Sequence, residues 1–194
     1  MTRPRGEIGA ILLTGGASRR MGHDKSLLLV DGVTLARRSG DLLQRVVDVA
    51  VEVGPGHSGL AATREEPAGE GPLAAVAAGR TLLRAMGSHG PALVIAGDLP
   101  FLDEALLRFL VDFDAPGTVL PVVEGRAQPL CARWGPGDLD AAGGFYARGI
   151  RSLRHLESQG EVTIVDESIW GDAVNARAFC DVDSPEDLAR YGLS

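Results

Sequence analysis

Cysteine and long apolar runs are scarce in this sequence. Its two cysteines, Cys131 and Cys180, lie far apart and form no CxxC pair, so we interpret them as two buried thiols in a reducing cytoplasm. No apolar run approaches the roughly 20 residues that a membrane span requires. The apolar stretch Ile8–Leu13 is short and runs into glycines, which argues against a signal peptide. We therefore expect a cytoplasmic protein with no membrane partner.

An excess of positive charge is absent as well. The 26 acidic residues outnumber the 19 lysines and arginines, and the formal net charge is −7. Because duplex binding usually needs a basic face, this balance argues against nucleic acid as a partner. A small phosphorylated substrate is still compatible, since a few basic residues at one site override the global charge. The 194 residues are 45% hydrophobic, enough for a full core, so we expect one domain over residues 1–194.

What the sequence does contain is an alternation of apolar strands and amphipathic helices. Gly9–Thr14 and Ala92–Ala96 are typical of strands buried on both faces, and Thr34–Val46 of an amphipathic helix capped by Thr34. The sequence also predicts strands at Val47–Val53, Thr118–Val123, Gln128–Trp134, Glu161–Val165 and Phe179–Val182, helices at Pro72–Met86, Asp103–Phe113, Gly149–Ser158 and after a Ser184 cap, and a loop at Gly54–Gly71. This order predicts an α/β fold, a doubly wound, mostly parallel sheet with helices on both faces.

A glycine-rich loop with basic residues follows the first predicted strand. Gly15 and Gly16 lack a Cβ, so their N–H groups can line a concavity that binds an anion. Arg19, Arg20 and Lys25 add positive charge to the same segment. Arginine can fork onto two phosphate oxygens and lysine acts as a compact point charge, so a triphosphate is the natural occupant.

Two familiar phosphate loops do not fit this segment. The Walker pattern needs GxxxxGK[ST], but Gly16 and Gly22 are six residues apart and His23 follows. The dinucleotide fingerprint GxGxxG is also absent after this strand. A P-loop ATPase and a hydride-transfer enzyme are therefore not favoured. The alternative to phosphate binding is a solvated, glycine-rich turn with incidental basic residues.

A second candidate loop, Gly97–Leu102, follows the strand Ala92–Ala96. Asp98 lies near its start, and Pro100 delays the next helix, so the carboxylate is expected at the same sheet edge as the glycine loop. One carboxylate there suits Mg²⁺, which takes oxygen ligands and keeps waters and substrate phosphates. Asp183 is a second metal candidate. For both aspartates, the alternative role is to form a turn or cap a helix.

The segment Leu13–Lys25 matches the pattern LxGGxSxRMGxDK nearly throughout, and the chain thereby resembles the molybdenum cofactor guanylyltransferases. The resemblance covers most of the chain: the family's GPLAG, CDMPxL, QPL and NINTPEDL segments correspond to Gly71–Ala75, Gly97–Leu102, Gln128–Leu130 and Asp181–Leu188. The departures from the pattern are Thr14 for Ala, Gly97 for Cys, Leu99 for Met, and Asp181 and Asp183 for Asn.

The resemblance implies a set of site residues. In the family, the backbone of the first strand's end holds the nucleotide, the lysine contacts its phosphates, and an acidic residue contacts guanine. Either Glu65 or Glu66 could correspond to that acid. The expected nucleotide-binding residues are Leu13, Thr14, Gly15, Gly16, Lys25, Glu65, Gly71 and Asp98. The expected catalytic residues are Arg19, Lys25 and Asp98, and the expected metal ligands are Asp98 and Asp183.

The implied reaction is transfer of GMP from GTP to the terminal phosphate of molybdopterin or Mo-molybdopterin, with Mg²⁺ as cofactor and pyrophosphate as product. The acceptor phosphate has a second pKa near ~6 and is largely dianionic at pH 7, so it needs no general base. This agrees with the lack of a Ser/His/Asp or Cys/His constellation in the sequence. Gln128, Arg133 and Arg151 are candidates for contact with the acceptor.

Two other functions stay open at this point. The first is a sister nucleotidyltransferase of the same fold, one that uses CTP with molybdopterin or acts on another phosphorylated metabolite. The second is a non-catalytic nucleotide-binding protein, which would keep the glycine loop but lose the metal carboxylate or the lysine. Both Asp98 and Lys25 are present, which disfavours the second function.

Overall fold

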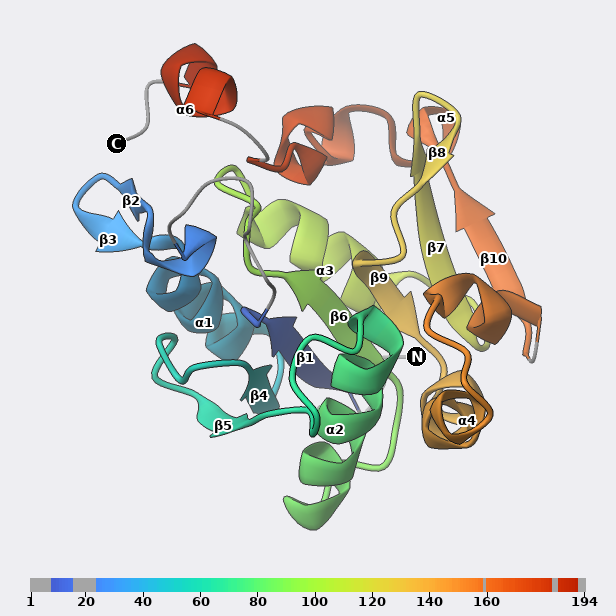
Figure 1. The fold of residues 1–194 in the computed structure, drawn as a ribbon. Helices are drawn as coiled ribbons and strands as arrows, with labels where there is room; N and C mark the ends of the chain where they lie inside the picture. Colours follow the sequence, from blue (N-terminus) through green and yellow to red (C-terminus); the bar gives the residue numbers. More distant parts are fainter. Residues whose placement is uncertain (1–7, 16–23, 159, 183–184, 192–194) are drawn as a thin grey trace.

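A computed structural model describes residues 8–15, 24–158, 160–182 and 185–191 of the chain. Across these residues an eight-stranded sheet has the order β10-β7-β9-β6-β1-β4-β5, with β8 paired to β7 (Figure 1). Its strands are β1 (Gly9–Leu13), β4 (Val49–Val53), β5 (Ala61–Thr63), β6 (Ala92–Ala96), β7 (Thr118–Val123), β8 (Arg126–Ala127), β9 (Cys131–Trp134) and β10 (Val162–Val165). A hairpin of β2 (Leu29–Val30) and β3 (Val33–Thr34) lies outside this sheet.

The sheet is mostly parallel. Strand β1 lies between β4 and β6 and pairs parallel with both, β4 pairs parallel with β5, and β7 pairs parallel with β10. Strand β9 is inserted between β6 and β7 and is antiparallel to each. The predicted α/β fold is therefore confirmed, with β9 antiparallel to both of its neighbours and the short β8 antiparallel to β7.

Helices cover both faces of the sheet. Helices α1 (Leu35–Val46) and α3 (Glu104–Asp112) pack on one face, and α2 (Pro72–Ala85) and α4 (Pro136–Ala147) pack on the other (Figure 1). Successive side chains of a strand point to opposite faces. Strand β1 therefore contributes Leu12 to the first core and Ile11 and Leu13 to the second. All five residues of β1 are buried, which explains its continuous apolar run.

Four of the five predicted helices begin where the sequence placed them. The Thr34 hydroxyl accepts a hydrogen bond from the N–H three residues later, at 3.3 Å, and α1 follows. Asp103 caps α3 in the same way, at 2.9 Å. Pro72 opens α2, and Pro185 opens α6 (Pro185–Tyr191), whose predicted cap Ser184 lies outside the described residues.

Three predictions of local structure are wrong. The expected helix Gly149–Ser158 contains only a 3₁₀ helix, Leu153–Ser158, because Gly149 has a φ of 84° and lies in the turn after α4. The expected strand Phe179–Val182 is instead the end of a 3₁₀ helix, Ala176–Phe179, and an extended segment. The expected loop Gly54–Gly71 contains the edge strand β5, whose small residues carry little strand signal.

Helix α4 was not predicted at all. Its sequence, PGDLDAAGGFYA, contains adjacent glycines and lacks a clear apolar period. Packing against α2 stabilises this helix, since Leu139, Ala142 and Phe145 are buried in the second core. After β10 come two short elements, α5 (Glu167–Trp170) and the 3₁₀ helix Gly171–Ala173, which precede the 3₁₀ helix Ala176–Phe179 and α6.

Arg133 does not contact an acceptor, contrary to the sequence prediction. It lies on β9 and is fully buried. Its guanidinium donates to the carbonyl oxygens of Leu110, Val111, Phe113 and Ala115 at 2.7–3.2 Å. These carbonyls lie at the end of α3 and just beyond it, so Arg133 closes that helix end and has a structural role.

Both cysteines are free thiols. Cys131 is buried on β9, and burial raises the pKa of its thiol to about 12. Cys180 is only partly buried, so the expectation of two buried thiols holds for Cys131 alone.

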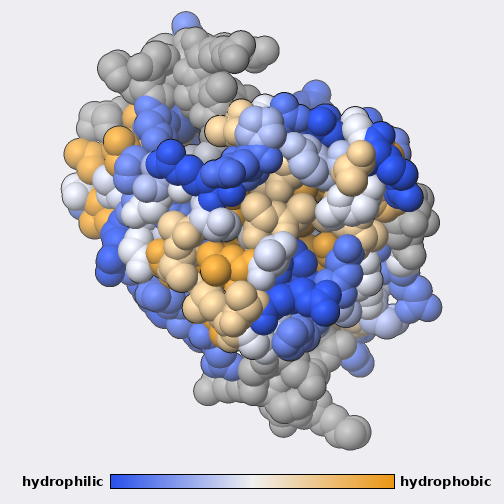
Figure 2. Space-filling view, turned by 60° about the horizontal axis from the view of Figure 1, so that its bottom comes forward, coloured by the Kyte–Doolittle hydropathy of each residue, from blue (hydrophilic) through white to orange (hydrophobic). Residues whose placement is uncertain are grey.

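Hydrophilic residues cover much of the surface around a smaller apolar area (Figure 2). Three of the exposed large apolar residues, Leu27, Leu29 and Val33, lie on the 3₁₀ helix Lys25–Leu27 and the adjoining β2–β3 hairpin. The remaining apolar side chains are largely inside the two cores, as expected of a folded domain. In the described part of the chain, no helix has both the length and the apolar character to cross a membrane.

Candidate functional site

The pairing of β1 with β6 brings the two candidate loops together. The two strands are parallel and in register, with Leu13 opposite Ala96, so both end at the same edge of the sheet. The chain continues to Gly15 after β1 and to Gly97 and Asp98 after β6. A hydrogen bond from the Gly97 N–H to the Leu13 carbonyl oxygen, at 2.8 Å, extends the pairing one step beyond the strands.

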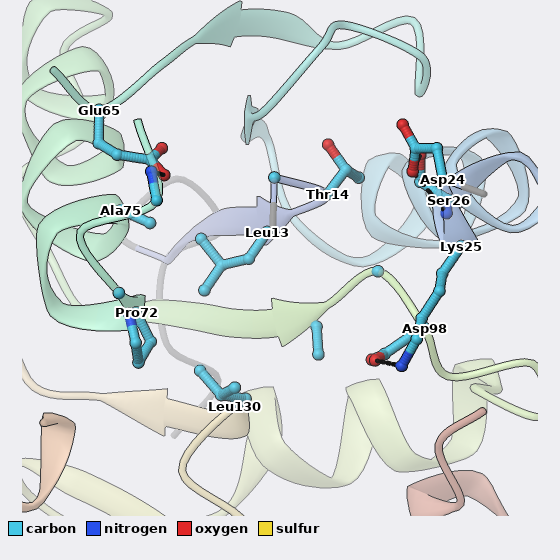
Figure 3. Close-up of a pocket in the computed structure, with 15 residues that line it drawn as sticks. Leu13, Thr14, Asp24, Lys25, Ser26, Glu65, Pro72, Ala75, Asp98 and Leu130 are labelled. Carbon is cyan, nitrogen blue, oxygen red and sulfur yellow. Dashed lines mark hydrogen bonds and ion pairs between the residues drawn. The ribbon is translucent and has the colours of Figure 1, made fainter. Parts of the chain in front are cut away.

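A cavity of about 300 Å³ opens at this edge (Figure 3). Ligand sites of α/β sheets are expected at this place, and the volume is at the lower end of the range for small-molecule pockets. Every expected nucleotide-binding, catalytic or metal-binding residue that the structure describes lines the cavity: Leu13, Thr14, Gly15, Lys25, Glu65, Gly71 and Asp98. The candidates for acceptor contact, Gln128, Arg133 and Arg151, do not line it. Arg19, Arg20, Gly16 and Asp183 lie outside the described residues. The role of each site residue stays a prediction.

Lys25 and Asp98 form an ion pair on one wall of the cavity. The Lys25 Nζ lies 3.6 Å from the Asp98 Oδ2, and the two side chains are 16% and 29% exposed. Lys25 begins a 3₁₀ helix that Asp24 caps, since the Asp24 carboxylate accepts from the Ser26 N–H at 3.0 Å. The cap fixes the start of this helix, and Lys25 reaches across to Asp98 (Figure 3).

Glu65 lies across the cavity from this ion pair (Figure 3). One oxygen of its carboxylate accepts from the Gly69 N–H at 3.1 Å. The other faces Gly15, where an added Cβ would lie 3.8 Å from it. Glu66, the alternative candidate, is not among the residues that line the cavity. The structure thus places Glu65, and not Glu66, at the site.

The backbone of the glycine loop differs from the sequence expectation in one respect. The N–H groups of Thr14 and Gly15 both donate to the Val53 carbonyl oxygen, at 3.1 and 3.0 Å. The Gly15 N–H is therefore already bonded to β4 and is not available to a phosphate. Any anion-binding N–H groups of this loop must come after Gly15, outside the described residues.

Two of the departures from the family pattern lie in contact with each other. A Cβ placed on Gly97 would lie 2.9 Å from the Leu13 carbonyl oxygen and 3.0 Å from the Thr14 Cγ2. The larger residue at position 14 thus faces the smaller one at position 97. The missing Cβ of Gly97 lets the two loops approach this closely.

A buried acid behind the cavity was missed by sequence reasoning. Glu52 on β4 is fully buried, and its carboxylate accepts a hydrogen bond from the Thr14 hydroxyl. It also accepts from the N–H groups of Gly56, His57 and Ser58 at 2.7–3.1 Å and from the Ser58 hydroxyl at 2.5 Å. The only signal in the sequence was a lone glutamate inside the apolar run VAVEV.

Burial raises the pKa of Glu52, but the hydrogen bonds from Ser58, Thr14 and Gly56 together outweigh it and hold the pKa below the ordinary 4.5. The carboxylate is therefore ionised at neutral pH. A carboxyl group with a lowered pKa in the folded state stabilises the fold above its unfolded pKa. That contribution to stability is lost as the pH falls through the pKa of the folded state.

We expect acid to remove the stability that Glu52 contributes. The difference in free energy of unfolding between the wild type and Glu52→Gln should be constant above about pH 5.5 and should shrink as the pH falls below 4.5. Urea unfolding of both proteins at pH 7, 5, 4 and 3 measures it. A difference that is the same at every pH would show that the charge of Glu52 is not involved.

We also expect Gly97→Ala to disturb the site. The added methyl group must displace the Leu13 carbonyl or the Thr14 side chain, at a cost of about 1–3 kcal/mol in free energy of unfolding. Gly143→Ala is the matched control, because a Cβ there meets no atom within 4 Å. In the background of Thr14→Ala, Gly97→Ala should lower the free energy of unfolding by less, because the Thr14 Cγ2 is then absent. Equal stability of the two glycine variants would contradict the contact.

A family model for the MobA-like NTP transferase domain matches residues 10–164 of this chain. The probable molybdenum cofactor guanylyltransferase of Natronomonas pharaonis is 31% identical in an alignment 200 positions long that covers 95% of this chain and 96% of that protein. The molybdenum cofactor guanylyltransferase of Rhodobacter capsulatus is 32% identical in an alignment 190 positions long that covers 94% of each protein.

Solved structures show the same fold. The molybdopterin-guanine dinucleotide biosynthesis protein A of Archaeoglobus fulgidus superposes with a TM-score of 0.75, at 20% identity over 94% of this chain and 95% of that one. The 2-C-methyl-D-erythritol 4-phosphate cytidylyltransferase of Thermus thermophilus superposes with a TM-score of 0.64, at 20% identity over 93% and 95%. The sequence matches show that the chain belongs to the MobA-like NTP transferase family and is a nucleotidyltransferase of the molybdenum cofactor guanylyltransferase group.

Proposed function

We propose that this protein transfers GMP from GTP to the terminal phosphate of molybdopterin or Mo-molybdopterin and releases pyrophosphate. The observation that carries the proposal is the placement of Lys25 and Asp98, 3.6 Å apart, at the edge where β1 and β6 end. The relatives that are over 30% identical along most of the chain bear the name of this activity, which supports it. The nucleotide would span the cavity, with its base toward Glu65 and its phosphates toward Lys25.

Glu65 favours guanine as the base. A carboxylate oxygen accepts hydrogen bonds, and guanine presents two donors, N1–H and N2–H, on the same edge. The Glu65 oxygen that does not bond to Gly69 faces the cavity side of Gly15. Cytosine presents only its N4 amino group as a donor, so it would match this acceptor less well.

Mg²⁺ is the expected cofactor, and the described residues fit it. Asp98 lines the cavity and is partly exposed. Mg²⁺ is commonly held by one or two carboxylates together with substrate phosphates and waters, so Asp98 could serve as its protein ligand without a second carboxylate. The Val182 N–H donates to the Asp98 carbonyl oxygen at 3.1 Å, which brings the segment that precedes Asp183 to this place. When bound, Mg²⁺ would neutralise charge on the α-phosphate.

Lys25 is the only lysine of the chain, beside eighteen arginines. Lysine carries a compact charge on a flexible stem, whereas the guanidinium of arginine is planar and wider. The single lysine lies on the cavity wall, where its ammonium would bind phosphate oxygens and stabilise the charge that develops on the leaving pyrophosphate. Arg19 is proposed to share this role.

The acceptor phosphate would attack the α-phosphorus in line, and the bond to pyrophosphate would break. The acceptor is largely dianionic at pH 7 and needs no proton removed, so positioning and charge neutralisation suffice. Arg151 lies beside Gly71 at the cavity rim, where it pairs with Glu70 at 2.7 Å and stacks on Tyr146. It would have to leave Glu70 to meet the acceptor. Gln128 bonds to the Arg126 carbonyl oxygen, and its role toward the acceptor stays a prediction.

We expect Lys25→Ala and Asp98→Ala each to lower guanylyl transfer by a factor of about 10² to 10³ while the protein stays folded. Pyrophosphate release from GTP, Mg²⁺ and molybdopterin measures the rate, and circular dichroism checks the fold. Lys25→Arg is the matched control: it keeps the charge and should recover part of the rate. CTP in place of GTP tests the choice of base. Wild-type rates in either alanine variant would refute the assignment.

A further inference from the structure

Glu52 does not line the cavity, but it connects the loop after β1, which does, to the turn after β4, which does not. Its Oε1 accepts from the Thr14 hydroxyl and from the N–H groups of Gly56 and His57, and its Oε2 accepts from Ser58. Thr14 begins the nucleotide loop after β1, whereas residues 56–58 belong to the turn after β4. One buried carboxylate therefore holds the starts of both loops.

The first connection acts on the backbone of the nucleotide loop. Thr14 and Gly15 donate their N–H groups to Val53, the residue after Glu52. The turn packs tightly here, because a Cβ on Gly54 would lie 2.1 Å from the Thr14 Oγ1 and 2.7 Å from the Gly15 nitrogen. The side-chain bond to Glu52 adds a third attachment to the same short stretch. Thr14 is consequently held by both its backbone and its hydroxyl.

The second connection leads to the part of the cavity wall that contains Asp24, Lys25 and Ser26. The backbone of His57 is fixed by Glu52, and the His57 Nδ1 lies 3.3 Å from the Ser26 Oγ and 3.7 Å from the Asp24 Oδ2. Asp24 caps the 3₁₀ helix that begins with Lys25. A chain of contacts thus runs from Glu52 through His57 and Asp24 to the start of the helix that carries the phosphate-binding lysine.

We propose that Glu52 is a positioning residue of the nucleotide site, which acts through the Thr14 hydroxyl on the nucleotide loop and through His57 on the helix of Lys25. The inference rests on the proposed function. A buried carboxylate suits this role because hydrogen bonds to an ionised acceptor are short and strong, and the absence of exposure keeps water from competing. It fixes the position of Thr14 relative to the helix of Lys25 before substrate enters, which lowers the ordering cost of binding.

Thr14→Val and Thr14→Ser separate positioning from packing. Valine keeps the shape of threonine and removes the hydroxyl, whereas serine keeps the hydroxyl and removes the methyl group. We expect Thr14→Val to raise the KM and the Kd for GTP about tenfold, the effect of one lost bond to a charged group, and Thr14→Ser to raise them clearly less, because serine keeps that bond. Calorimetric titration with GTP and Mg²⁺ gives the Kd, and pyrophosphate release gives kcat and KM.

Three further variants complete the test. Glu52→Gln should raise the Kd for GTP as Thr14→Val does, and the double variant should show less than the product of the two effects. Ser58→Ala removes a donor on the other carboxylate oxygen, away from Thr14, and should lower the melting temperature with the Kd within about twofold. If Glu52→Gln does not fold, the Thr14 pair decides alone.

The proposal is overturned if Thr14→Val binds GTP as tightly as Thr14→Ser at temperatures where both are folded. In that outcome Glu52 only stabilises the fold. A wild-type protein that neither binds GTP nor releases pyrophosphate would instead refute the proposed function, and this inference with it. The wild-type titration, done first, distinguishes the two failures.

Discussion

The site depends on the parallel, in-register pairing of β1 with β6. This pairing makes two loops that are more than 80 positions apart in sequence leave the sheet at one edge, and the bond from Gly97 to Leu13 fixes how closely they approach. A shift of one residue would exchange the faces to which Ile11 and Leu12 point and would bury the wrong side chains in each core. The hydrophobic cores on both faces of the sheet therefore specify the geometry of the polar edge.

Behind that edge, polar and charged groups are held by burial and hydrogen bonds. Glu52 satisfies its carboxylate with donors from two loops, and Arg133 satisfies the carbonyl oxygens at the end of α3. Each is deeply buried and leaves its partners unpaired if it is removed, so each keeps a local geometry that apolar packing alone would leave adjustable. In a reaction that proceeds through positioning and charge neutralisation, such rigidity bears directly on rate.

Much of this fold could be predicted from the sequence, because its central elements carry strong local signals. Strand β1 is apolar throughout, and α1 begins at a capping threonine. Helix α4 could not be predicted, because its glycines remove the periodic signal and packing against α2 stabilises it. The edge strand β5 was missed for a similar reason, since it is formed by pairing with β4.

The candidate site was predictable where a residue suited to binding phosphate or metal lies in a loop that follows a buried strand. Lys25 and Asp98 belong to loops that must follow buried strands, and the structure brings both to one cavity. Sequence reasoning could not decide between Glu65 and Glu66, because the path of the backbone determines which of the two lines the cavity. It included Arg133 among the candidates for acceptor contact because the charge of an arginine can be read from a sequence and its burial cannot. It missed Glu52 because the donors to its carboxylate come from residues up to 38 positions away.

The single lysine allows a direct test of the account. Acetic anhydride modifies Lys25 and the α-amino group, and peptide mass spectrometry measures each separately, so that the α-amino group is an internal reference. We predict that GTP with Mg²⁺ protects Lys25 but not the α-amino group, and that acetylation of Lys25 abolishes pyrophosphate release. Labelling of Lys25 that is unchanged by saturating GTP and Mg²⁺ would contradict a nucleotide bound between the ends of β1 and β6.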